Sequence, residues 1–129
     1  MEHIESLEMY LETIYRLRES GARAKSVDIA VELGFSRPSV SNAIKKMLND
    51  GYVFVDKMGE IALTEKGQTK AQSVYERHCV LKELLIKVGA DEKTAEDNAC
   101  RVEHVISEEM FDILKKYYEN NFWFKFLNP

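Results

Sequence analysis

The sequence predicts a mainly helical fold with one small β-hairpin, and three observations support this prediction. The chain of 129 residues contains only two prolines and six glycines, so few residues interrupt helices. Apolar residues recur at helical spacing in most segments, as in the series Leu7, Leu11 and Ile14. Residues 52–63 differ, because two short apolar runs flank a turn that contains glycine, which is typical of a hairpin.

Three helices are predicted before the hairpin, over residues 6–19, 26–33 and 36–50. Gly21 and Gly34 follow the first and second segments, and glycine is common just after a helix end. Ser26 and Ser36 have the short hydroxyl side chains that cap helix N-termini. Pro38 falls in the first turn of the third helix, where proline is tolerated.

Three more helices are predicted after the hairpin, over residues 64–88, 91–105 and 107–118. Thr64, Asp91 and Ser107 stand at their starts as N-caps, and Gly89 ends the first of the three. Residues 120–129 form an aromatic tail to which the sequence assigns no role.

Charge is divided unevenly along the chain. The formal net charge is −4, from 18 Lys and Arg against 22 Asp and Glu, which by itself argues against a nucleic-acid ligand. Residues 21–49 nevertheless hold five basic and two acidic side chains, whereas residues 76–129 hold eight basic and 11 acidic ones. A basic segment within an acidic chain indicates a local nucleic-acid-binding surface.

The sequence contains neither a predicted membrane span nor an export signal. No apolar run approaches the roughly 18 residues that a span requires, and the acidic N-terminus is unlike a signal peptide. Cys79 and Cys100 are too few for a disulfide scaffold and are expected to be reduced thiols. We therefore expect a cytoplasmic protein without membrane contacts.

The order helix, helix, turn, helix and hairpin is that of a winged helix-turn-helix. The third helix would read DNA with its polar face. Its predicted core-facing residues are Val40, Ile44, Met47 and Leu48. The residues predicted to contact DNA are Lys25, Ser36, Arg37, Pro38, Ser39, Ser41, Asn42, Lys45, Lys46 and Lys57. The alternative is a small helical protein in which this is only a solvated helix face.

A second group of residues has the side chains of a metal site. Cys100, Glu103 and His104 are spaced i, i+3 and i+4, which places a thiolate, a carboxylate and an imidazole on one helical face. These groups are common ligands of divalent transition metals. The other candidate ligands are Met9, Glu12, His78 and Glu96. Taken singly, each is more often a core or surface residue, so the prediction depends on the cluster.

Five motifs follow one another along the chain: EMYLETIY (8–15), RPSVS (37–41), LTEKG (63–67), RH (77–78) and NACRVEHVIS (98–107). Together they resemble the diphtheria toxin repressor family of metal-dependent transcriptional regulators, which includes iron- and manganese-dependent repressors. The resemblance implies a winged helix-turn-helix domain over residues 1–70 and a helical metal-binding and dimerisation domain over residues 71–129. Many members carry a third, SH3-like domain, which a chain of 129 residues is expected to lack.

The resemblance also implies a mixed ligand set. The residues that match one site of the iron-responsive branch are Met9, Cys100, Glu103 and His104, whereas Glu12 matches a ligand of the manganese-responsive branch. His78 matches a histidine of a second, neighbouring site in both branches. Two positions depart from that second site in the iron branch, with Glu96 replacing a histidine and Lys82 replacing a glutamate. The second site would be rebuilt from Glu12, His78, Glu96 and Glu103, or be weak.

The expected function is a metal-activated repressor that binds a palindromic double-stranded operator as a homodimer and controls metal homeostasis. A thiolate and a thioether favour Fe(II), with Mn(II) as the alternative, while Zn, Co or Ni would bind in vitro. The apolar residues expected at the dimer contact are Ile106, Met110, Phe111, Ile113, Leu114 and Tyr117. Neither a substrate pocket nor a separate general base is evident, so we expect no enzymatic activity and no small-molecule substrate. A winged-helix regulator that senses something other than metal is the competing interpretation.

Overall fold

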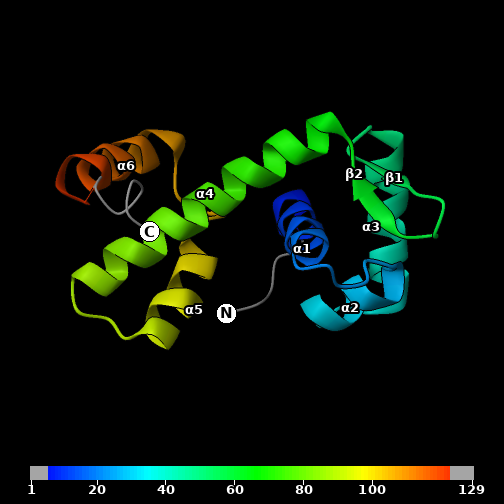
Figure 1. Cartoon of the computed structure of the whole chain (residues 1–129), viewed down its shortest axis with the longest axis horizontal. Coiled ribbons are helices and arrows are strands. Elements are labelled where there is room, and N and C mark those ends of the chain that lie inside the picture. The colour runs from blue at the N-terminus through cyan, green and yellow to red at the C-terminus, as the bar shows by residue number, and fades with distance from the viewer. Residues whose placement is uncertain (1–5, 123–129) are drawn as a thin grey trace. The chain divides into compact units, whose positions relative to one another are not determined.

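The computed structural model describes residues 6–122 and confirms a mainly helical fold with a two-stranded sheet (Figure 1). The elements are α1 (Leu7–Glu19), α2 (Ser26–Leu33), α3 (Arg37–Asn49), β1 (Val53–Val55), β2 (Ile61–Leu63), α4 (Glu65–Lys87), α5 (Glu92–Val102) and α6 (Glu108–Phe122). The chain forms two compact units, Met1–Ser73 and Val74–Pro129. None of the described helices combines the length and the apolar character needed to cross a membrane. Residues 123–129 of the aromatic tail lie outside the described residues.

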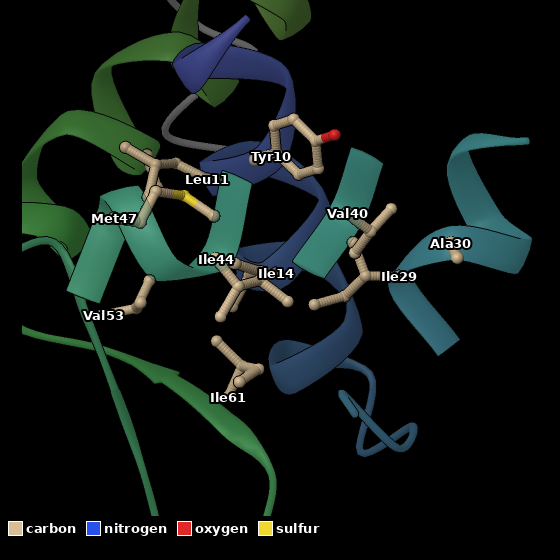
Figure 2. Packing of buried hydrophobic residues seen from close by; sticks show 11 residues of the cluster. Tyr10, Leu11, Ile14, Ile29, Ala30, Val40, Ile44, Met47, Val53 and Ile61 are labelled. Atoms are coloured by element: carbon tan, nitrogen blue, oxygen red, sulfur yellow. The ribbon is translucent and has the colours of Figure 1, made fainter. Parts of the chain in front are cut away.

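The first unit is held together by an apolar core that α1, α2, α3 and the hairpin share. Its buried members are Tyr10, Leu11, Ile14, Ile29, Ala30, Val40, Ile44, Met47, Val53, Ile61 and Ala71. Figure 2 shows Ile14 of α1, Ile44 of α3 and Ile61 of β2 meeting near the centre of this cluster. Because the apolar face of α3 is buried here, its polar face is left to solvent.

The hairpin is anchored to the segment that precedes α2. Strands β1 and β2 pair antiparallel, with Val55 opposite Ile61. The Ile61 N–H donates to the Ala24 carbonyl (2.8 Å), and the Ala24 N–H donates to the Glu60 carboxylate (2.9 Å). The turn at residues 56–60 therefore projects from a fixed base, as the wing of a winged helix does.

Helix α4 begins in close contact with the start of the hairpin. The Thr64 hydroxyl donates to the Gly51 carbonyl (2.6 Å) and accepts the Gly67 N–H (3.1 Å), so Thr64 caps α4 as predicted. A Cβ atom at Gly67 would overlap the backbone carbonyl oxygen of Tyr52. Glycine at this helical position thus permits a close approach between two backbone segments.

The second unit consists of the C-terminal part of α4 with α5 and α6, both of which flank α4 (Figure 1). Its apolar cluster contains Val80, Phe111 and Tyr118, with Leu84 and Ile106 packed against them. The Arg77 guanidinium lies over the Phe111 ring at 5.9 Å and donates to the Glu103 carbonyl (3.0 Å). Arg77 therefore ties α4 to the connection between α5 and α6.

The end of α5 differs from the prediction. The helix ends at Val102 instead of residue 105, so Glu103 is its C-cap and His104 lies in the following turn. The Val105 N–H donates to the Val102 carbonyl three residues back (3.0 Å), which is a tighter turn than that of an α-helix. This tightening lets the chain leave the helix before Ser107, whose hydroxyl accepts an N–H from the first turn of α6.

Three smaller predictions were also wrong. Lys25 rather than Ser26 is the N-cap of α2, and α6 continues to Phe122. Leu48, which was expected to face the core, is 40% exposed. It directly follows the buried Met47 and so points about 100° away from it around the helix.

Candidate functional site

His78 lies at the centre of a polar group inside the second unit. Its Nε2 is 2.8 Å from a carboxylate oxygen of Glu96, and its Nδ1 is 2.9 Å from a carboxylate oxygen of Glu103. The Cys100 Sγ lies 3.8 Å from the same Nδ1. His78 and Glu103 are only 3% and 1% exposed, so they depend on each other as partners. Helix α5 and its C-cap thus surround the imidazole that α4 supplies.

Glu103 joins the two histidines of this group. Its Oε2 contacts His78, while its Oε1 lies 3.1 Å from Nε2 of His104. The bond from Arg77 to the backbone carbonyl of Glu103 holds the chain at this point. The structure therefore brings together five of the predicted ligands in one connected group: His78, Glu96, Cys100, Glu103 and His104.

The surroundings of His78 favour a positive charge. Burial opposes the charged imidazolium, but the hydrogen bonds with Cys100 and Glu103 and the negative charge of Glu103, helped by Glu96, raise the pKa of His78 to about 10. Burial likewise opposes the charge of Glu96, yet its hydrogen bonds with His78 and Lys82 hold the pKa of that carboxyl below its usual value. A metal cation in place of the proton on the His78 imidazole would be attracted by the same carboxylates of Glu96 and Glu103.

The donor atoms fit a divalent transition metal. One donor atom from each of His78, Glu96 and Cys100 can be chosen such that all three lie within 4.8 Å of one another. Ligand atoms that lie about 2.0–2.3 Å from a tetrahedral metal ion are about 3.3–3.8 Å from one another, so the three side chains would move closer together to bind one ion. Imidazole, carboxylate and thiolate together suit Fe, Co, Ni or Zn better than Mg or Ca.

The remaining predicted ligands, Met9 and Glu12, lie on α1 in the first unit. They are three residues apart and so share one side of that helix. The Glu12 carboxylate pairs with the Arg16 guanidinium at 2.6 Å and is therefore already engaged by a cation within its own helix. The participation of Met9 and Glu12 in a metal site stays a prediction.

The solvent-facing side of α3 carries most of the residues predicted to contact DNA. Its exposed polar, basic and proline residues are Ser36, Arg37, Pro38, Ser41, Asn42, Lys45 and Lys46. Ser39 is half-buried, and its N–H and its hydroxyl both bond to the Ser36 hydroxyl that caps the helix. Lys57 is exposed in the wing turn, and Lys25 is half-buried at the start of α2.

The contribution of α2 to this face was missed by the sequence reasoning. A surface pocket is lined by Ser26 and Val27 of α2 together with Arg37 and Ser41 of α3. Ser26 and Arg37 are the first residues of their helices, so two helix N-termini converge on the pocket. Such termini offer unpaired N–H groups that suit phosphate oxygens. Only the packing of α2 against α3 creates this convergence.

Comparison with known families gives two matches that together cover most of the chain. The N-terminal DNA-binding domain of the iron-dependent repressors matches residues 2–60. The metal-binding and dimerisation domain of the same repressors matches residues 64–121.

Individual relatives agree with these matches. An HTH-type transcriptional regulator of Methanocaldococcus jannaschii is 37% identical over 89% of this chain and 94% of its own length. The diphtheria toxin repressor of Corynebacterium diphtheriae is 38% identical over 83% of this chain and 48% of its own. The solved structure of the manganese regulator SloR is 30% identical, with a TM-score of 0.77 over 91% of this chain and 55% of its own. The chain thus spans about half the length of the latter two proteins. It belongs to the iron-dependent repressor family of metal-dependent transcriptional regulators.

Proposed function

We propose that the protein is a metal-activated transcriptional repressor, which binds a palindromic operator as a homodimer and controls metal homeostasis. The observation that carries the proposal is the connected group of five ligand-type side chains around His78, in a chain whose α3 presents a polar, partly basic face. Membership of the iron-dependent repressor family supports both halves of the proposal.

The residues of the second unit would act as a preassembled ligand group. A bound divalent ion would supply the positive charge that these carboxylates attract. Arg77 holds the end of α5, so that Glu103 and His104 present their donor atoms together. Met9 and Glu12 would add ligands from the first unit, as the sequence predicts. The loaded site would then favour the state in which two recognition helices enter successive major grooves, about 34–36 Å apart.

The proposal of a homodimer is supported by the surface of α6. Met110, Ile113 and Tyr117 are all exposed and recur at i, i+3 and i+7, so they share one side of the helix. Phe111, which was also expected at the dimer contact, is buried in the core of the second unit instead. Ile113→Asp should therefore shift the protein towards monomer in sedimentation analysis, and an unchanged dimer would contradict this choice of interface.

We propose Fe(II) as the physiological ion, with Mn(II) as the alternative. The Cys100 thiolate favours the softer ion, whereas carboxylates favour Mn(II). Cys100→Glu, which exchanges the thiolate for a carboxylate, should therefore shift the metal that activates DNA binding towards Mn(II). An unchanged preference would mean that the thiolate does not set selectivity.

The decisive experiment is an anaerobic DNA-binding titration. An operator is first selected from random-sequence duplexes in the presence of Fe(II) or Mn(II), and its affinity is then measured with ion or with chelator. Wild type should bind only with ion. Cys100→Ala and His104→Ala should remain folded but should lose the DNA binding that the ion induces. Cys79→Ala is the matched control, since Cys79 is the other free cysteine of the described chain. DNA affinity that is indifferent to both ions would contradict the proposal and favour a regulator that senses something else.

A further inference from the structure

Lys82 contacts the ligand group from one turn further along α4 than His78. Its Nζ lies 3.3 Å from Oε2 of Glu96 and 3.5 Å from a carboxylate oxygen of Glu92. The same Oε2 atom of Glu96 lies 2.8 Å from Nε2 of His78. One carboxylate oxygen of Glu96 is thus shared between the His78 imidazole and the Lys82 ammonium group.

The position of Lys82 makes this ammonium a lasting neighbour of the site. Its side chain is only 26% exposed, whereas that of Glu92 is 83% exposed. Residues 78 and 82 are four apart on one helix, so both side chains project towards the same part of α5. Charges that are partly withdrawn from solvent are screened less by salt than surface charges are.

We propose that Lys82 weakens metal binding at His78, Glu96 and Cys100, and so sets the ion concentration at which the site fills. This inference rests on the proposed function. An ion that binds through Glu96 must share the carboxylate with a positive charge, and like charges repel at this range. Because Glu92 offers the ammonium a second partner, Lys82 can release Glu96 to an ion. This release costs free energy, so Lys82 weakens ion binding without preventing it.

The opposite effect is physically reasonable and must be distinguished. By holding the Glu96 carboxylate in place, Lys82 could preorganise a ligand and thereby strengthen metal binding. The two effects differ in sign, so removal of the charge decides between them.

The test is direct metal binding by the purified full chain without DNA. Co(II) affinity is measured anaerobically by competition with a chelating indicator, and the thiolate-to-cobalt absorption band reports whether Cys100 is a ligand. Lys82→Met, which keeps an unbranched apolar side chain, should bind Co(II) about 3- to 10-fold more tightly, because loss of a partly screened charge pair corresponds to about 1 kcal/mol. The absorption band should be unchanged, since the ligands are the same.

Two controls separate the charge from the general effects of substitution. Lys82→Arg retains the charge and should retain wild-type affinity. Lys115→Met removes a lysine of the same unit that pairs with Glu76, outside the ligand group, and should leave affinity unchanged. Unchanged or weaker binding by Lys82→Met would overturn the inference while leaving the proposed repressor function intact. Absence of Co(II) binding by wild type would instead contradict the proposed function and this inference with it.

Discussion

The two units of the chain are stabilised in different ways. The first buries a large cluster of apolar side chains from α1, α2, α3 and the hairpin. The second has a smaller apolar cluster on α4 and α6 and buries the ionisable side chains of His78 and Glu103. Among the described residues, the first unit buries one carboxylate side chain, that of Glu12, which pairs with Arg16 of the same helix. Apolar burial stabilises a fold whatever the solution contains, whereas buried charges stabilise it only while their partners remain.

This difference indicates a division of labour. A unit that must present a recognition helix in a constant orientation benefits from a core that is indifferent to ions and pH. A unit that responds to an ion needs groups whose energy changes when the ion binds. The four predictions below test this contrast, from the largest expected effect to the smallest.

Ile14→Ala should lower the free energy of unfolding by about 2–5 kcal/mol, because it removes a fully buried side chain from the core of the first unit. The loss should be the same with ion and with chelator, as measured by urea denaturation. Val31→Ala, at a position that is 77% exposed on α2, is the control and should change stability by less than about 0.5 kcal/mol. A loss that depended on the ion would break the contrast between the units.

A divalent ion at 100 times its dissociation constant should raise the free energy of unfolding by about 2.7 kcal/mol, since it binds only the folded chain. Cys100→Ala should lose most of this increase, and Cys79→Ala should keep it. Thermal unfolding with Co(II) or Mn(II) measures both. Equal stabilisation of the two variants by the ion would mean that Cys100 is not a metal ligand.

Gly67→Ala should destabilise the chain by about 1–3 kcal/mol, because the added methyl group would collide with the Tyr52 carbonyl oxygen. In an unobstructed helix the same change is expected to stabilise by about 0.5–1 kcal/mol. The sign of the change in the free energy of unfolding, measured by urea denaturation, therefore tests the contact between α4 and the hairpin. Thr69→Ala, at an exposed position of the same helix, provides the neutral reference.

When no ion is present, the second unit should lose stability at alkaline pH through His78 and at acid pH through Glu96, whereas the first unit should lose it at acid pH through Asp56. The raised pKa of His78 contributes stability that is fully present below about pH 6.5 and is lost as the pH rises towards 10. In the first unit the Glu60 N–H and the Arg18 guanidinium lower the pKa of Asp56, whose contribution is lost below about pH 3.8. Urea denaturation of His78→Gln and Asp56→Asn across the pH range measures each contribution. A loss of stability at alkaline pH that persists in His78→Gln would show that His78 is not its cause.

Most elements of the fold could be predicted from local signals. Ser6, Ser36, Thr64 and Asp91 cap their helices as short polar residues do, and the apolar spacing of α1 and α3 identified their buried faces. Local signals were insufficient at the end of α5, where the chain leaves the helix at Val102. That ending involves a bond from Arg77, which is 26 residues away from Glu103 in the sequence.

The candidate ligands were identified from spacing on one helix, but the spacing argument was only partly correct. Cys100 lies on α5 as expected, whereas Glu103 and His104 belong to its C-cap and the following turn. They nevertheless join one group, because His78 on α4 contacts Glu103 and Glu103 contacts His104. The convergence of α2 and α3 on the pocket beside Arg37 left no comparable pattern in the sequence.

The sequence by itself determined the helices, the hairpin, the polar face of α3 and the identity of the ligand-type residues, because caps, turns and periodicity act over a few neighbouring residues. Tertiary structure alone decided that Glu103 bridges two histidines, that Gly67 lies against Tyr52 and that Lys82 shares a carboxylate oxygen with His78. These relations join residues that are distant in the chain, so they depend on how helices pack. The same packing joins polar residues that are separate in the sequence into one connected group.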